Sequence, residues 1–515
     1  MHHDPLPSPS LSLYWTESRR ATTKKNARSK SMFEWVYGNT VDDVDHRSIS
    51  SATTTAATVP ISPKISDDYV QSFLIRFSKA LVTYGAPSHR LDHCVQLLMR
   101  KFGIKAQFGY FPGFLVVSFG DPESLTAAAQ LVKVSPGLDL QRLCSIYQLF
   151  ESILCDKMTV QEAFASLENI VASPDIYPTW LTILCYGLAS STSTLLFFSG
   201  GLMDILFGFI SGLIVATGVV HVSNKITRFT SIFDVLTSAV VGFLSAAAAS
   251  RITSPTTCFH ALSLGGVVTL LPGYATFVSV LEMASGSVAT GTLQLTTTLI
   301  YSLLVGFGLA IGASAHQVMF PKLALVSSDE VCSRSLSWLF DIILVPSFAA
   351  ANLVIMRGRI SKYPIMLLLA ALSRGIHQVC MNYFVAYPHI ATVLAAFGVA
   401  TASNVYARLV PTVGFVDMIM GLLFLVPGSV GVSSSLDTFG QALTSSPMTE
   451  VSVILNAGQQ GIIFSSHMMV IAVSVSVGLV LAAAVLYPVR KMLDYKRSRK
   501  NNKYRVRDWV GEVTF

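Results

Sequence analysis

The sequence predicts a mainly α-helical, polytopic membrane protein with about ten transmembrane helices in two inverted five-helix repeats, preceded by a small α+β cytosolic domain. Composition is the first observation, because 52% of the residues are hydrophobic and only 13% are charged, against roughly 25% charged in soluble proteins. Apolar stretches long enough to cross a bilayer are the second observation. A Pro-Gly motif that occurs twice inside these stretches is the third.

The part of the chain before the apolar stretches divides into a tail and a domain. Residues 1–66 are rich in Ser, Thr and basic residues and contain no long apolar run. They predict a disordered cytosolic tail, with an anchor on anionic lipid as the alternative. Residues 67–173 have the composition of a soluble protein and are predicted to form the cytosolic domain.

Apolar spacing and turn residues predict the elements of this domain. A first helix ends at the turn 84–87, and Ser88 caps a second amphipathic helix. Strands are predicted at 106–111 and 113–119. Two further helices follow, which completes an α+β arrangement.

The start of the second helix carries the charged cluster His89, Arg90, Asp92 and His93. Two histidines at positions i and i+4 can share a metal ion, but no third ligand is nearby in the sequence. The cluster is therefore either a functional motif or an exposed helix start. The seven cysteines form no C-x-x-C pair, so we predict no metal and no cofactor, and without a catalytic pattern we predict no enzyme.

The membrane part begins at residue 174. A bilayer core of about 30 Å calls for about 20 apolar residues per helix. On this rule the first repeat covers 174–313 and the second covers 338–487. The predicted spans are 180–198, 202–221, 232–250, 259–281, 292–313, 338–356, 363–384, 389–409, 412–432 and 465–487.

The repeated motif interrupts the fourth span of each unit. Pro272-Gly273 matches Pro427-Gly428, and at the same offset Leu281-Glu282 matches Leu436-Asp437. Proline and glycine free backbone groups that lipid cannot satisfy, so such breaks persist where protein or a water-lined cavity satisfies them. Because five is odd, the second unit enters the membrane from the opposite side. The paired breaks predict a site shared between inverted repeats, whereas a single Pro-Gly is also a common kink.

Basic residues predict the orientation in the membrane. Lys and Arg crowd the ends of spans that face the N-terminal domain and the tail 488–515, whereas the loop from about Ser433 to Ser465 has none. By the positive-inside rule both termini are cytosolic. The net charge of +7 thus reflects topology, and we expect no nucleic-acid partner. No sorting signal distinguishes the plasma membrane from endomembranes, and a homo-oligomer stays open.

Several motifs resemble the threonine/serine exporter family. They are Tyr84-Gly85-Ala86-Pro87-Ser88-His89-Arg90-Leu91-Asp92, Pro112-Gly113-Phe114, Gly200-Gly201-x-x-Asp204 and both Pro-Gly motifs. The resemblance covers roughly residues 67–490 and is nearest to the fungal branch, the pheromone-regulated membrane proteins. It departs at Asp92-His93, where family members often carry Glu-Glu. The resemblance implies export of threonine and serine, coupled to protons in bacterial relatives, with a cytosolic N-terminal domain.

Ionisable residues inside the predicted spans are further candidates for the transport site. A charge in the membrane is costly and usually faces a cavity or a partner. Asp204 and Asp234 are candidates for a coupling proton or a substrate ammonium, or else reach the interface from a helix end. Arg374 is the deepest charge and either meets a substrate carboxylate or is paired structurally.

The sequence therefore favours a secondary transporter that exports small polar amino acids, with a bilayer, an amino acid and a coupling proton as partners. The alternative is a multi-pass membrane protein that transports nothing and acts in pheromone response or membrane remodelling. Hydroxyl-rich runs such as Ser190-Ser191-Thr192-Ser193-Thr194 suit an amino-acid pathway, but they are first of all expected at helix–helix contacts.

Overall fold

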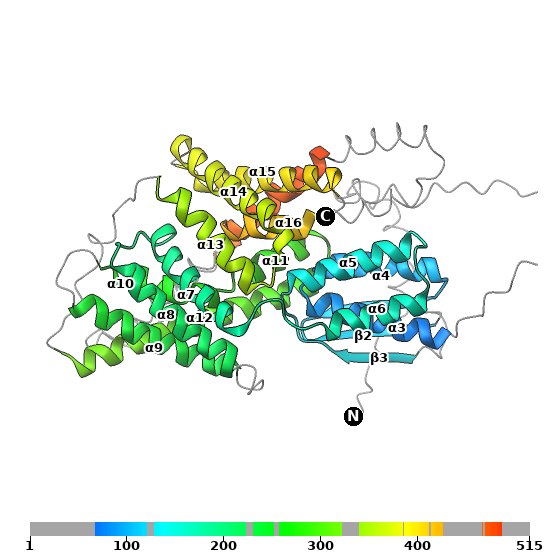
Figure 1. Ribbon diagram of the computed structural model, residues 1–515, viewed down its shortest axis with the longest axis horizontal. Helices are drawn as coiled ribbons and strands as arrows, with labels where there is room; N and C mark the ends of the chain where they lie inside the picture. The colour runs from blue at the N-terminus through cyan, green and yellow to red at the C-terminus, as the bar shows by residue number, and fades with distance from the viewer. Residues whose placement is uncertain are drawn as a thin grey trace, which may run out of the picture. The chain divides into compact units, whose positions relative to one another are not determined.

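The computed structural model (Figure 1) describes these residues of the chain: 67–120, 128–222, 230–251, 257–321, 339–384, 386–410, 414–425, 466 and 469–486. Internal contacts divide the chain into Met1–Lys64 and Ile65–Phe515, and all described residues belong to the second unit. The predictions for both tails and for Pro427 and Gly428 fall outside the described residues.

The region before the apolar helices combines helices with one small sheet. Its elements are α3 (Asp67–Thr83), α4 (Ser88–Phe102), β1 (Ala106–Phe111), β2 (Phe114–Phe119), β3 (Ala128–Lys133), α5 (Leu140–Leu154) and α6 (Val160–Ala172). The sheet is antiparallel in the order β1-β2-β3. Phe111 pairs with Phe114 across a tight turn in which Gly113 has a φ of 98°, a value that glycine tolerates.

The hairpin of β1 and β2 is confirmed, whereas β3 was not predicted. Its residues read Ala-Ala-Gln-Leu-Val-Lys, which lacks the alternation of β-branched and polar residues that marks a strand. Pairing with β2, in which Phe119 lies opposite Ala128, decides the conformation of this segment. On β2 the alternate residues Leu115 and Val117 are fully buried, and α3 contributes Phe73 and Phe77 to the same core.

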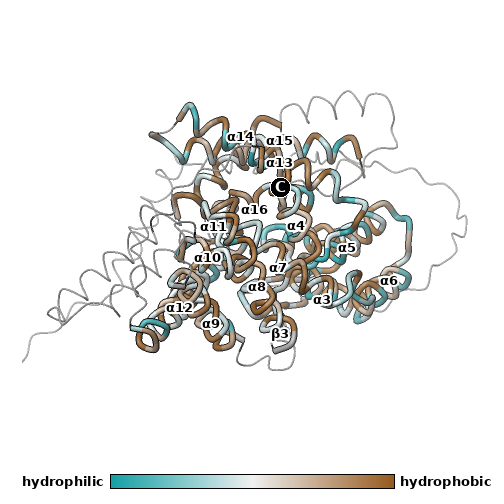
Figure 2. The backbone as a smooth tube through the Cα atoms, turned by 60° about the vertical axis from the view of Figure 1, so that its left-hand side comes forward, coloured by the Kyte–Doolittle hydropathy of each residue, from teal (hydrophilic) through white to brown (hydrophobic). Residues whose placement is uncertain are grey.

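The apolar helices follow in the order α7 (Thr179–Leu196), α8 (Asp204–Thr217), η1 (Gly218–Val222), α9 (Thr230–Arg251), α10 (Phe259–Gly266), η2 (Val268–Leu270), α11 (Gly273–Ala284), α12 (Val288–Met319), α13 (Asp341–Ile355), η3 (Ile360–Lys362), α14 (Tyr363–Tyr383), α15 (Pro388–Leu409) and α16 (Gly414–Leu423). A further helix covers Met469–Leu486. Figure 2 shows that brown, hydrophobic residues predominate along α8 and α12, while teal residues are frequent on α6.

Within the described part of the chain, length and apolarity identify five helices that suffice to cross a membrane, or six if the bent pair of α10 with η2 and α11 is one span. Shorter apolar helices cover Asp204–Val220, Asp341–Ile355 and Gly414–Leu423. The chain is thus mainly helical with several membrane-spanning helices and a small sheet. Each of the ten predicted spans overlaps a described helix, while their number and inversion stay a prediction.

Glycines allow close approach of helix backbones in two separate places. A Cβ atom added at Gly308 of α12 would lie 2.6 Å from the carbonyl oxygen of Val235 and 3.0 Å from the Cβ of Ser238 in α9. At Gly478, in the helix Met469–Leu486, it would lie 2.6 Å from the carbonyl oxygen of Val393 and 2.7 Å from Ala396 Cβ in α15. Such distances leave no room for a side chain without movement of a helix.

Gly266 and Gly421 form a second pair of glycines that pack closely against corresponding helices. Gly266 of α10 faces Val241 of α9 and Ser211 of α8, at 2.8 and 2.9 Å from an added Cβ. Gly421 of α16 faces Val399 of α15 and Leu369 of α14, at 2.7 and 3.0 Å. In both pairs of glycines, each residue that faces the later glycine lies 158 positions after the residue that faces the earlier glycine. The corresponding positions are 235 and 393, 238 and 396, 241 and 399, and 211 and 369.

Candidate functional site

The helix breaks where Pro272 and Gly273 predict it. Helix α10 ends at Gly266, η2 follows, and Pro272 precedes α11, with a bend of 50° between the two arms. Pro272 has no N–H to continue a helix, but its carbonyl oxygen accepts hydrogen bonds from the backbone N–H of Thr276 at 3.0 Å and from its hydroxyl at 2.8 Å. The new helix therefore starts directly at the break.

Carbonyl groups that the break frees are satisfied by helix α7. The hydroxyl of Ser190 donates to Gly266 O and the hydroxyl of Ser193 donates to Gly265 O, both at 3.3 Å. The two serines come from the hydroxyl-rich run that the sequence assigned first to helix–helix contacts. The backbone at the end of α10 is thus satisfied by protein, as a break inside a membrane requires.

The acidic candidates are each held by a different neighbour. Asp204 is fully buried at the start of α8, and its Oδ2 accepts hydrogen bonds from the N–H of Gly201 at 2.7 Å and of Cys258 at 3.4 Å. It therefore joins the starts of α8 and α10. Asp234 of α9 accepts a hydrogen bond from the hydroxyl of Tyr301 in α12 at 3.0 Å. Among the described contacts none joins the two aspartates.

Arg374 is placed beside a carboxylate. Its Nε donates to Asp341 Oδ2 and its Nη2 donates to the carbonyl oxygen of Leu196, both at 3.3 Å. The arginine of α14 thus links the start of α13 to the end of α7. This is the structural pairing that the sequence left open as the alternative to substrate binding.

The motif at the start of α4 separates into an exposed and a buried part. Asp92 is exposed and accepts a hydrogen bond from Gln96 of the next turn at 2.8 Å. Arg90 is only 1% exposed. The pKa of His89 is lowered to about 3 by burial and by the charges of Arg90 and His93, so its imidazole is neutral at physiological pH.

The buried part of this motif contacts the broken helix. The first turn of a helix has N–H groups without intrahelical partners, and the N–H of Ser88 donates to Glu282 Oε1 of α11 at 2.9 Å. Arg90 lies near two rings, with its Cζ 4.6 Å from the centre of Phe415 in α16 and 5.9 Å from that of Tyr147 in α5. We call Ser88, Arg90, Tyr147, Glu282 and Phe415 the junction cluster.

The junction cluster was only partly visible in the sequence. Glu282 belongs to the repeated motif, and an acidic residue in an apolar run is a signal for a functional position. It was nevertheless not among the predicted site residues. Nothing in the sequence marks Tyr147 or Phe415, which are separated from Arg90 by 57 and 325 positions. Their contribution depends on tertiary contacts alone.

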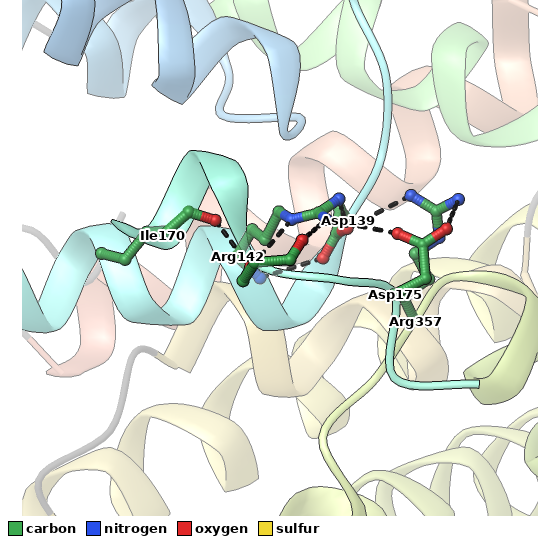
Figure 3. A network of polar contacts seen from close by, with 6 residues as sticks. Asp139, Arg142, Ile170, Asp175 and Arg357 are labelled. Atoms are coloured by element: carbon green, nitrogen blue, oxygen red, sulfur yellow. Dashed lines mark hydrogen bonds and ion pairs between the residues drawn. The ribbon is translucent and has the colours of Figure 1, made fainter. Parts of the chain in front are cut away.

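Other contacts join the α+β region to the same ends of the apolar helices. Thr290 at the start of α12 donates to Tyr110 O at 2.8 Å, and Leu140 N donates to Met356 O at 3.1 Å. Figure 3 shows the accompanying ion pairs. Asp175 binds Arg142 at 3.2 Å and Arg357 at 2.8 Å, and both arginines also bind Asp139, at 3.0 and 3.5 Å.

Comparisons with known proteins agree with the motifs. The family described as putative threonine/serine exporter matches residues 72–316. An uncharacterized protein of Schizosaccharomyces pombe is 31% identical over 427 residues, which are 82% of this chain and 56% of that protein. Pheromone-regulated membrane protein 10 of Eremothecium gossypii is 30% identical over 421 residues, 81% of this chain and 56% of the relative.

The same protein of Saccharomyces cerevisiae is 28% identical over 429 residues, 81% of this chain and 54% of the relative. The chain thus spans about half the length of these curated relatives. No solved structure matches. Residues 72–316 are therefore similar to the putative threonine/serine exporter family, and the chain is a membrane protein similar to the fungal pheromone-regulated membrane proteins.

Proposed function

We propose that this chain is a secondary transporter that exports small polar amino acids such as threonine and serine, coupled to protons. Its transport site lies between two inverted five-helix repeats, at the broken helices of Pro272-Gly273 and Pro427-Gly428. The match to a putative exporter family supports the transporter class. Discontinuous helices at corresponding places of two repeats are a recurrent way to build a substrate site near the membrane midplane.

The observation that carries this proposal is the repeated packing around the broken helix. Along the sequence, Gly266 precedes Pro272 by the same number of residues as Gly421 precedes Pro427. Each glycine fits against the second and third helices of its own unit, at facing residues 158 positions apart. Two units with the same internal contacts support a two-fold arrangement, in which both breaks approach one axis.

Contacts of the α+β region support the proposed orientation. This region contacts Glu282, Thr290, Met356 and Phe415. In the predicted topology all four lie at helix ends on the cytosolic side. A cytosolic N-terminal domain with both termini in the cytosol is consistent with these contacts and with the positive-inside rule.

Asp204 and Asp234 stay candidates for proton or substrate binding. Asp204 Oδ1 is buried and has no hydrogen-bond partner among the described residues, which supports Asp204 as the group that carries the coupling proton. Arg374 has Asp341 as its partner within the second repeat and donates to the carbonyl oxygen of Leu196 in the first, so we assign it to the packing of the two repeats rather than to the substrate.

The test is flux of labelled threonine and serine in proteoliposomes, with and without an imposed pH gradient. We expect gradient-dependent flux that Asp204→Asn and Pro427→Ala abolish or strongly reduce, while Gly375→Ala, at an open position of α14, leaves it unchanged. Absence of flux for these and other amino acids in folded protein would refute the transporter and favour the interaction-protein alternative.

A further inference from the structure

The junction cluster contains a buried cation whose hydrogen-bond donors are unused. Nε, Nη1 and Nη2 of Arg90 are all buried and have no hydrogen-bond partner among the described residues. A buried charge without a partner is costly, and native proteins contain few such groups. The rings of Phe415 and Tyr147 cover the guanidinium at 4.6 and 5.9 Å. They contribute cation–π attraction but accept no N–H in the plane of the group.

The geometry of arginine restricts what can satisfy these donors. The guanidinium is planar, and its N–H groups point outward in its plane, where they match the two oxygens of a carboxylate. A partner of Arg90 therefore has to meet the edge of the guanidinium. The buried hydroxyl groups of Tyr147 and Ser88 lie next to Arg90 and Glu282, respectively. They are additional donors for an anionic group.

Acceptors without partners are found in the same cluster. Glu282 Oε1 accepts the N–H of Ser88, but Oε2 is buried and has no partner in the described part of the chain. His89 Nδ1, next to Arg90, is likewise buried and unpartnered. The cluster therefore needs both a hydrogen-bond acceptor for the N–H groups of Arg90 and a hydrogen-bond donor for Oε2 of Glu282.

We propose that Arg90 and Glu282 bind the zwitterionic backbone of an α-amino acid at the junction between α4 and the broken helix. The carboxylate binds the edge of Arg90 with help from the Tyr147 hydroxyl, and the ammonium group binds Glu282 Oε2. This inference rests on the proposed function, because it makes the junction the place where substrate binds on its way to the site between the repeats. A neutral ligand satisfies neither charge, and a simple anion leaves Glu282 unsatisfied.

Burial of the cluster adds a condition for binding. Ser88, Arg90 and Phe415 are 6%, 1% and 1% exposed, so an amino acid reaches them only when the start of α4 moves away from α11 or α16. The hydrogen bond from Ser88 to Glu282 crosses this boundary. We therefore expect ligand binding to compete with the contact between α4 and α11.

The experiment measures binding by calorimetry to the full chain in detergent, with L-serine, L-serinamide and glycerate as probes. Serinamide lacks the carboxylate, and in glycerate a hydroxyl replaces the ammonium group. We expect serine to bind and each analogue to bind about tenfold more weakly or worse, as loss of a charge-assisted hydrogen bond predicts. Equal affinity for serine and serinamide would overturn the role of Arg90, and equal affinity for glycerate would overturn that of Glu282.

Variants test the same assignment independently. Arg90→Gln and Glu282→Gln are expected to lose at least about tenfold in serine affinity, while Arg100→Gln, at an exposed arginine of the same helix, keeps it. Tyr147→Phe removes one buried hydroxyl beside Arg90 with little change in shape, and it is expected to weaken serine binding severalfold. Unchanged affinity in Arg90→Gln, or no serine binding to the folded intact chain, would refute the site.

Flux measured on the same preparations separates the two proposals. Serine binding that depends on Arg90, without flux in proteoliposomes, would overturn the transporter and leave the junction site standing. Flux that is unchanged in Arg90→Gln and in Glu282→Gln would overturn the junction site and leave the transporter standing.

Discussion

Close packing of glycine against helix backbones predicts that two substitutions, 170 positions apart, have the same effect. In Gly308→Ala the new Cβ lies 2.6 Å from Val235 O, and in Gly478→Ala it lies 2.6 Å from Val393 O. Both contacts are with backbone, which cannot move aside without shifting a helix. We expect each change to lower the free energy of unfolding by about 1–3 kcal/mol, the usual cost of overpacking.

The assay is thermal unfolding of the purified full chain in detergent, with Gly375→Ala as the matched control. An added Cβ at Gly375 meets nothing within 4 Å. There alanine gains helix propensity, about 0.5–1 kcal/mol, without a clash. The two test variants should therefore melt below the intact chain and the control at or above it.

The comparison between the two test variants examines the repeat itself. Similar losses at Gly308 and Gly478 are expected if the third and fifth helices of each unit pack alike. Destabilisation at Gly308 with none at Gly478 would contradict the equivalence of the two units. If both variants melted like Gly375→Ala, the close backbone approach itself would be refuted.

Three further predictions concern charged groups. Because the pKa of His89 is about 3 when folded and 6.5 in a model peptide, stability falls as pH drops below 6.5. Between pH 7 and 5.5 the loss is about 1 kcal/mol, and His89→Gln should flatten this part of the pH dependence of unfolding. Lys362→Met removes a cation that lies 3.1 Å from the fully buried Asp417. It should cost about 3–5 kcal/mol in thermal unfolding, and Asp417→Leu in addition should recover most of the loss. Arg142→Ala removes a mostly buried side chain and should lower the free energy of unfolding by about 1.5–3 kcal/mol. Arg357→Ala should lower it by less than about 1 kcal/mol, because the Arg357 side chain is 42% exposed. Equal losses in the two variants would contradict this ranking.

The sequence determined the features that depend on composition and local order. An apolar, weakly charged chain requires a membrane, and alternating residues around Pro112 and Gly113 specify a hairpin. Pro272 and Gly273 specify the break, because a proline nitrogen cannot donate and this restriction holds in any tertiary context. The sequence motifs also indicated the similarity to the threonine/serine exporter family that the comparisons found.

Only the tertiary structure decided which polar groups meet. Arg90 and Asp92 lie on opposite faces of α4, as helical spacing predicts, but the packing of Phe415 of α16 against Arg90 is a tertiary contact. Likewise, Ser190 satisfies a carbonyl freed 76 positions later. Periodicity specifies which face of a helix is apolar, but the partner of a buried polar group lies on another element. Its identity therefore depends on how the helices pack, and only the fold brings the members of the junction cluster together.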